Sequence, residues 1–407
     1  MSESLFLVSF FIKRLSSGKS TFLNAACLTD VKVSELPFTT IDANKGVAYT
    51  KTECVCKELD VVDNPKNSTC MEGFRFIPIN LLDVAGLVPD AHKGKGLGNK
   101  FLNDLGQADI LIHVVDITGS LDKMGKPVST GMNDPYEDIL FLDNEINMWY
   151  KDILEREDWN RFSRAFAGKK KEFIEELQKR LSGIKIKNEQ IILSLKNSQL
   201  DNKNPSTWTE EDLMYFSKNL RELTKPILIV ANKIDKEISN ENLNNLKKKY
   251  DKIIVPCSAL AENFLRKYHD DGKINYIPGS NDFEITNEEK LSAKEIEMLK
   301  KIKTNILKEY NGTGVQEVIN HAIFKVAEHI CVYPVSDATH LTDNDGNVLP
   351  DVFLVKKGTL LRDFVRDKIH SDLAKHFIHG IDVRTKKRVG ENYELQNNDI
   401  VKIVSAK

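Results

Sequence analysis

The chain has 407 residues, 41% hydrophobic and 29% charged, which is typical of a globular protein with two or three domains. Lys and Arg number 58 against 60 Asp and Glu. The net charge of −2 excludes a histone-like polycation and an acidic disordered tail but allows a local basic patch. Six cysteines are too few for a disulfide-stapled secreted fold, so we expect reduced thiols and a cytoplasmic location.

The first predicted element is a buried β-strand over residues 5–12. This apolar run is far shorter than the ~20 residues that cross a bilayer. Its basic residues, Lys13 and Arg14, follow the run instead of preceding it, and no small-residue cleavage site is evident. We therefore expect neither a signal peptide nor a membrane partner.

A phosphate-binding loop is predicted directly after this strand. Gly-Lys-Ser-Thr at 18–21 leads into a helical sequence, and strand, loop and helix are the context that this motif needs. Glycine lets backbone N–H groups approach phosphate oxygens, Lys19 can reach the β and γ phosphates, and Ser20 can ligate Mg²⁺.

Three further motifs follow in order, each at the carboxyl end of an apolar strand. In Asp-Val-Ala-Gly at 83–86, Asp83 can hold Mg²⁺ through water and the Gly86 N–H can sense a γ-phosphate. In Asn-Lys-Ile-Asp at 232–235, Asp235 can accept both N–H donors of a guanine edge, a pattern that adenine lacks. Ser258 and Ala259 follow the strand at 253–256 and can supply a backbone N–H to the guanine carbonyl.

Any one of these motifs could be a surface loop of chance composition, but four in this order predict a guanine-nucleotide domain. The candidate nucleotide-binding residues are Gly18, Lys19, Ser20, Thr21, Asp83, Gly86, Asn232, Lys233, Asp235, Ser258 and Ala259.

Two long segments resemble the switches of a known family. Leu-Pro-Phe-Thr-Thr-Ile-Asp-Ala-Asn-Lys-Gly at 36–46 looks like the first switch of Obg-type GTPases. Asp-Val-Ala-Gly-Leu-Val-Pro at 83–89, followed by Ala-His-Lys-Gly-Lys-Gly-Leu-Gly-Asn at 91–99, looks like the second switch of the YchF-like branch. The resemblance extends over essentially the whole chain, and the guanine-type motif at 232–235 is closer to the GTP-type archaeal and fungal subgroup.

This resemblance implies a slow, Mg²⁺-dependent GTPase that binds GTP and GDP and is associated with ribosomes or translation. It also implies that Ser20 and Thr40, or the neighbouring Thr39, ligate the Mg²⁺. The catalytic group is unknown. Leu87 stands where many GTPases carry a water-orienting Gln, and His92 is a possible substitute, although a loop histidine more often caps or faces solvent.

The phosphate loop departs from the family pattern Gly-x-Pro-Asn-x-Gly-Lys-Ser, because Lys13, Leu15 and Ser16 replace its first Gly, its Pro and its Asn. The Cβ of Lys13 would crowd a turn that normally needs glycine. We favour an incorrectly assigned N-terminal segment as the explanation. The alternative is an impaired nucleotide site, in which case the chain would serve as an RNA or ribosome adaptor.

The predicted fold class is α/β, a P-loop G domain with a mostly parallel sheet. We predict this domain at 1–119 and 223–329, and a helix-rich segment at 120–222 with a capping box at 207–210. By resemblance, that segment is the family's coiled-coil-like insertion, and a small ubiquitin-like β-grasp at 330–407 is its TGS domain.

The resemblance also implies that the TGS domain contacts RNA or the ribosome. Its basic bias suits a phosphate backbone, but no interleaved aromatic platform is evident. The basic residues are Lys356, Lys357, Arg362, Arg366, Arg384, Lys386, Lys387 and Arg388.

Three cysteines cluster in the sequence at Cys54, Cys56 and Cys70. Three thiols with no clear fourth ligand nearby are a weak zinc signal, and ordinary buried or surface thiols are the simpler interpretation.

Overall fold

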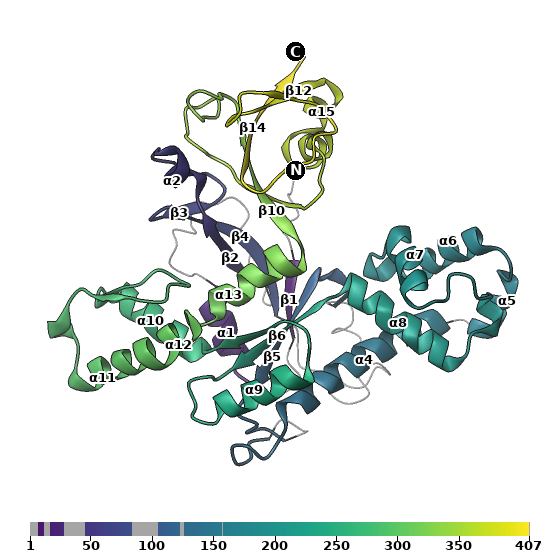
Figure 1. Ribbon diagram of the computed structural model, residues 1–407, viewed down its shortest axis with the longest axis horizontal. Helices are drawn as coiled ribbons and strands as arrows, with labels where there is room; N and C mark the ends of the chain where they lie inside the picture. The colour runs from purple at the N-terminus through teal and green to yellow at the C-terminus, as the bar shows by residue number, and fades with distance from the viewer. Residues whose placement is uncertain are drawn as a thin grey trace.

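The computed structural model describes residues 7–11, 17–27, 45–83, 105–122, 126–156 and 158–406. Its centre is a seven-stranded sheet in the order β2-β4-β1-β5-β6-β7, with β3 paired to β4 (Figure 1). The strands are β1 (Leu7–Phe11), β2 (Lys45–Glu53), β3 (Thr69–Met71), β4 (Phe74–Asp83), β5 (Ile110–Asp116), β6 (Ile227–Asn232) and β7 (Ile254–Cys257).

The five strands from β4 to β7 pair in parallel, whereas β2 and β3 pair with β4 in antiparallel fashion. Every residue of β5 and β6 is buried, as expected for central parallel strands that are covered on both faces. The predicted α/β class with a mostly parallel sheet is therefore confirmed.

Helices cover both faces of this sheet. On one face Phe22 and Val318 pack against Ile112 and Leu228, and on the other Leu142 and Leu246 belong to the cluster around Ile229. The helices that flank the sheet are α1 (Lys19–Ala26), α4 (Pro135–Glu155), α9 (Ser239–Lys249), α10 (Ala259–Asp270) and α13 (Val315–Asn320), the last continued by the π-helical η7 (His321–Val326).

A helical arm extends from the sheet between β5 and β6 (Figure 1). The capping box predicted at 207–210 is wrong by two residues. Thr209 caps α8 instead, and its partner is Asp212, because residue 207 still belongs to a preceding 3₁₀ turn. Beyond α4, the arm contains α5 (Trp159–Ala165), α6 (Lys170–Arg180), η3 (Ser182–Ile184), α7 (Asn188–Asn197), η4 (Pro205–Thr207) and α8 (Glu210–Thr224).

A second projection follows α10 and returns to the sheet at α13 (Figure 1). It consists of β8 (Ile274–Asn275), β9 (Glu284–Ile285), η5 (Glu288–Lys290), α11 (Ala293–Ile302), the π-helical η6 (Lys303–Leu307) and α12 (Lys308–Tyr310).

The C-terminal part is a separate five-stranded sheet in the order β11-β10-β14-β12-β13, with β10 and β14 parallel. Leu361, Phe364 and Val365 pack on it through one helical face, which is the expected β-grasp arrangement. Its elements are β10 (His329–Val335), β11 (Phe353–Lys356), α14 (Leu361–Phe364), the π-helical η8 (Val365–Ile369), α15 (Ser371–Lys375), β12 (Phe377–Asp382), β13 (Arg388–Val389) and β14 (Asp399–Ser405).

The hairpin of β2, β3 and β4 reaches this C-terminal sheet, together with the short helix α2 (Val55–Leu59). Asn67 exchanges two hydrogen bonds with the backbone of Val352, and Arg384 makes a bidentate ion pair with Glu58. No helix of the described residues is both long and apolar enough to span a membrane. The exact domain boundaries stay predictions.

Candidate nucleotide-binding site

Gly18 begins the helix α1 in a conformation that only glycine adopts easily. Its φ is 91°, and a Cβ built there would lie 2.3 Å from Nδ2 of Asn232. Lys19, Ser20 and Thr21 form the first turn, whose backbone N–H groups have no intrahelical acceptor and so suit phosphate oxygens.

Lys19 lies beside the acidic residue that ends β4. Its Nζ is 2.8 Å from Oδ1 of Asp83, and both side chains are partly exposed. Asp83 is placed there because β4 and β1 are parallel, with Asp83 in register with Phe10. The carboxylate of Asp83 and the exposed Ser20 are hard oxygen donors, so this corner fits Mg²⁺ chemically.

Asn232 ties the phosphate loop to the guanine motif. Its Nδ2 donates to the backbone carbonyl of Ser17 at 3.0 Å, and its Oδ1 accepts from the backbone N–H of Ala259 at 3.2 Å. Asn232 is almost fully buried, so both bonds are made away from water. Three segments far apart in the sequence are thereby held in one place.

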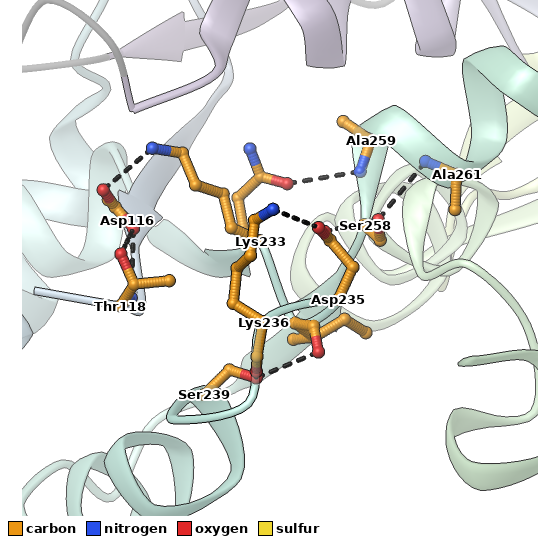
Figure 2. Close-up of polar contacts among 11 residues, drawn as sticks. Asp116, Thr118, Lys233, Asp235, Lys236, Ser239, Ser258, Ala259 and Ala261 are labelled. Atoms are coloured by element: carbon orange, nitrogen blue, oxygen red, sulfur yellow. Dashed lines mark hydrogen bonds and ion pairs between the residues drawn. The ribbon is translucent and has the colours of Figure 1, made fainter. Parts of the chain in front are cut away.

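Lys233 connects the guanine motif to the end of β5, as Figure 2 shows. It has a left-handed φ of 72°, and its Nζ donates to Oδ2 of Asp116 at 2.9 Å. Burial opposes ionisation of Asp116, but hydrogen bonds from Thr118, Lys233 and Ser120 outweigh it and keep the pKa of this carboxyl below its usual value. Asp116 therefore remains charged and fixes the ammonium group of Lys233.

Asp235 is held by the residue that caps α10. The Ser258 hydroxyl donates to Oδ1 of Asp235 at 2.8 Å and accepts from the backbone N–H of Ala261 at 3.3 Å (Figure 2). Lys236 lies 3.7 Å from the other carboxylate oxygen. Asp235 and Ser258 line a cavity of about 580 Å³, and a carboxylate retains further lone pairs for N–H donors.

The structure thus brings together Gly18, Asn232 and Ala259, and separately Lys19 with Asp83. It gives the backbone N–H of Ala259 a partner inside the protein, so a contact with a guanine carbonyl through this group stays a prediction. Several predicted residues lie outside the described ranges, namely Lys13, Leu15, Ser16, Thr39, Thr40, Gly86, Leu87 and His92.

The sequence reasoning missed Asp116, Thr118 and Ser120. A signal was available, because Asp116 is an acidic residue that ends a continuous buried strand next to two of the predicted motifs. The carboxyl ends of parallel strands meet at one edge of a sheet, which is the usual place for a ligand.

Comparison with known proteins places the chain in a family. Three family models match: a 50S ribosome-binding GTPase at residues 10–148, the G4 motif-containing domain of the Obg-like, YGR210-like GTPases at 230–337, and a TGS domain at 339–405. An uncharacterized GTP-binding protein of Methanocaldococcus jannaschii is 46% identical over 390 residues, which cover 96% of each chain.

Another uncharacterized GTP-binding protein, from Schizosaccharomyces pombe, is 36% identical over 86% of this chain and 87% of its own. Among solved structures, a GTP-binding protein of Pyrococcus horikoshii superposes with a TM-score of 0.77 at 37% identity, covering 99% of this chain and 100% of its own. The YchF GTPase of S. pombe has a TM-score of 0.59 at 16% identity, covering 99% of this chain and 98% of its own, and supports the fold.

Proposed function

This chain belongs to the Obg-like GTPase family, in its YGR210-like group of GTP-binding proteins, and from that membership we propose that it hydrolyses GTP as a slow, Mg²⁺-dependent switch. The observation that carries the proposal is the double attachment of Asn232. One amide holds both the phosphate loop at Ser17 and the turn at Ala259, next to Asp235. The groups that would bind phosphate and the carboxylate that would read a base are therefore parts of one site.

The protein's own residues have separable tasks in this proposal. Lys19, now paired with Asp83 at 2.8 Å, would exchange that carboxylate for phosphate oxygens. Asp83 would then be free to hold the metal's water shell beside Ser20. Bound Mg²⁺ would supply charge neutralisation of the phosphates.

Recognition of guanine falls to Asp235. The Ser258 hydroxyl donates to only one carboxylate oxygen of Asp235, so the carboxylate can still accept the two N–H groups of a guanine edge. Adenine presents no such pair of donors and would leave the charge unpaired, which a site of this kind rejects.

The test is Asp235→Asn in the full chain, assayed with fluorescent GTP, ATP and XTP analogues in Mg²⁺. The amide swaps an acceptor for a donor, so we expect GTP affinity to fall about 10- to 100-fold, with XTP now preferred. Glu241→Gln is the control, because it removes a negative charge from the exposed side of the nearby helix α9 and does not line the cavity beside Asp235. Unchanged preference for GTP over XTP in Asp235→Asn would contradict the role of Asp235.

We also propose association with the ribosome through the TGS domain. The Bacillus subtilis relative named ribosome-binding ATPase YchF is 31% identical over 254 residues, which cover 60% of this chain and 63% of its own.

The basic residues suggested for this contact differ in whether their charge is already paired within the protein. Arg362, Arg366 and Arg384 are engaged in ion pairs with Glu391, Asp363, Asp367 and Glu58.

Lys386 and Lys387 are exposed at the turn between β12 and β13, and Arg388 is exposed at the start of β13. These three residues are the better candidates for phosphate contacts. Changing all three to Glu should abolish co-sedimentation with ribosomes, while reversing Lys170 and Lys171 on the helical arm should not. Equal co-sedimentation of the two variants would contradict a contact at this turn.

The alternative of an adaptor with an impaired phosphate loop has no support in the described residues. Gly18 begins α1 with a left-handed φ and Lys19 lies beside Asp83, and both observations are compatible with nucleotide binding. The substitution at Lys13 lies outside the described ranges.

A further inference from the structure

A cluster of metal-ligating side chains lies at the opposite end of β4 from Asp83. The ligand atoms of Cys54, Cys56, Asp63 and Cys70 all lie within 4.8 Å of one another. Cys54 and Cys56 stand at the start of α2, Asp63 follows that helix, and Cys70 is on β3. Asp63 adds a fourth side chain that is able to ligate a metal, which the sequence pattern did not reveal.

The distances in this cluster suit a shared ion better than a disulfide bond. Sγ of Cys56 and Sγ of Cys70 are 3.8 Å apart, and Sγ of Cys54 lies 3.1 Å from Oδ2 of Asp63. A disulfide would need about 2.05 Å. In a tetrahedral zinc site with Zn–S bonds of about 2.3 Å, neighbouring sulfurs are about 3.8 Å apart.

The charge around the cluster also fits a metal. Three thiolates and one carboxylate around Zn²⁺ carry a net charge of −2, which needs compensation in a buried place. Arg75 is fully buried beside them and donates to Oδ2 of Asp63 at 2.8 Å, to Ser68 and to the carbonyl of Leu349. This is the oxygen that faces Cys54, so Arg75 holds the carboxylate of Asp63 toward the cysteines, and such hydrogen bonds commonly orient a metal-ligating carboxylate.

We propose that Cys54, Cys56, Asp63 and Cys70 form a structural zinc site that holds the tip of this hairpin against the C-terminal domain. Four protein ligands leave no open position, which is typical of a structural and not a catalytic zinc. Each cysteine binds the metal as a thiolate, so zinc binding displaces the thiol protons and makes retention of the metal depend on pH.

The segment that the zinc would fix contacts the C-terminal domain. Between Asp63 and Cys70, the backbone N–H groups of Asn64 and Lys66 donate to the carbonyls of Val348 and Pro350, and Asn67 pairs with Val352. This segment contains no helix, and a strand begins only at residue 69, so it gains order mainly from these contacts. The metal would therefore couple the orientation of the C-terminal domain to the sheet that carries the nucleotide site.

The first experiment is elemental analysis of the full chain produced in zinc-supplemented medium and purified without chelator. We expect about one zinc per chain, all of it released when a mercurial reagent blocks the thiols of the wild-type protein. Cys56→Ser and Cys70→Ser should lose this zinc, whereas Cys27→Ser, at a cysteine outside the cluster, should keep it.

A second measurement covers the case in which the serine variants fail to fold. Asp63→Cys completes the four-cysteine set common in structural zinc sites, and it should retain one zinc. Chelation of zinc from the wild-type chain should also increase protease cleavage between residues 59 and 69. Absence of zinc, stoichiometric iron in its place, a disulfide within the cluster, or zinc that survives in Cys56→Ser and Cys70→Ser would overturn the proposal.

Discussion

Replacing Gly18 by Ala tests the packing of the phosphate loop against the guanine motif. The left-handed φ of 91° costs an alanine about 1–2 kcal/mol. In addition, the new Cβ would stand 2.3 Å from Nδ2 of Asn232, so this side chain must move. Its two hydrogen bonds, at 3.0 and 3.2 Å, contribute about 0.5–1.5 kcal/mol each. The expected loss in the free energy of unfolding is therefore about 2–5 kcal/mol.

Gly168→Ala is the matched control, because Gly168 has a φ of 73° and no heavy atom within 4 Å of its built Cβ. It should lose only the backbone cost of about 1–2 kcal/mol. Urea unfolding followed by circular dichroism measures both losses, and a fluorescent GTP analogue should bind more weakly to Gly18→Ala alone. In an Asn232→Ala background, the extra cost of Gly18→Ala should disappear. Equal losses for the two glycine variants in the wild-type background would refute the reasoning.

Two further predictions concern the connection to the C-terminal domain. Burial lowers the pKa of His329 from 6.5 to about 4, so between these pH values only the unfolded chain binds the proton. The free energy of unfolding should therefore fall as the pH drops from 6.5 to 4. In urea unfolding, His329→Gln should reduce this pH dependence. Arg384 and Glu58 form a bidentate pair that lowers the pKa of Glu58, so its contribution is present above pH 4.5 and is lost in acid. Because both side chains are partly exposed, a double-mutant cycle at pH 7 should give a coupling free energy of about 0.5–1 kcal/mol. This coupling should decrease in high salt, and a coupling of zero would contradict the pairing.

Local sequence determined the elements and the order of the motifs. Gly18 and the residues after it predicted the start of α1, because the glycine and the helix-forming residues that follow it are adjacent in the sequence. The largely apolar runs at β5 and β6 also predicted buried strands, since a strand that is covered on both faces is mostly apolar. The resemblance to the Obg-like family, carried by the long motifs at 36–46 and 83–99, supplied the insertion and the TGS domain.

Tertiary structure alone decided which side chains meet. The residues next to Asn232 in the sequence do not predict that its amide contacts Ser17, 215 residues away. They also do not predict the ion pair between Asp116 and Lys233. Asp63 likewise lies seven residues beyond Cys56 in an ordinary polar loop, and it becomes a candidate ligand only because α2 and β3 fold it back onto the three thiols. A local motif reflects the backbone conformation of the few residues around it. Contacts between distant segments depend on the order of the strands in the sheet, so neither segment alone predicts them.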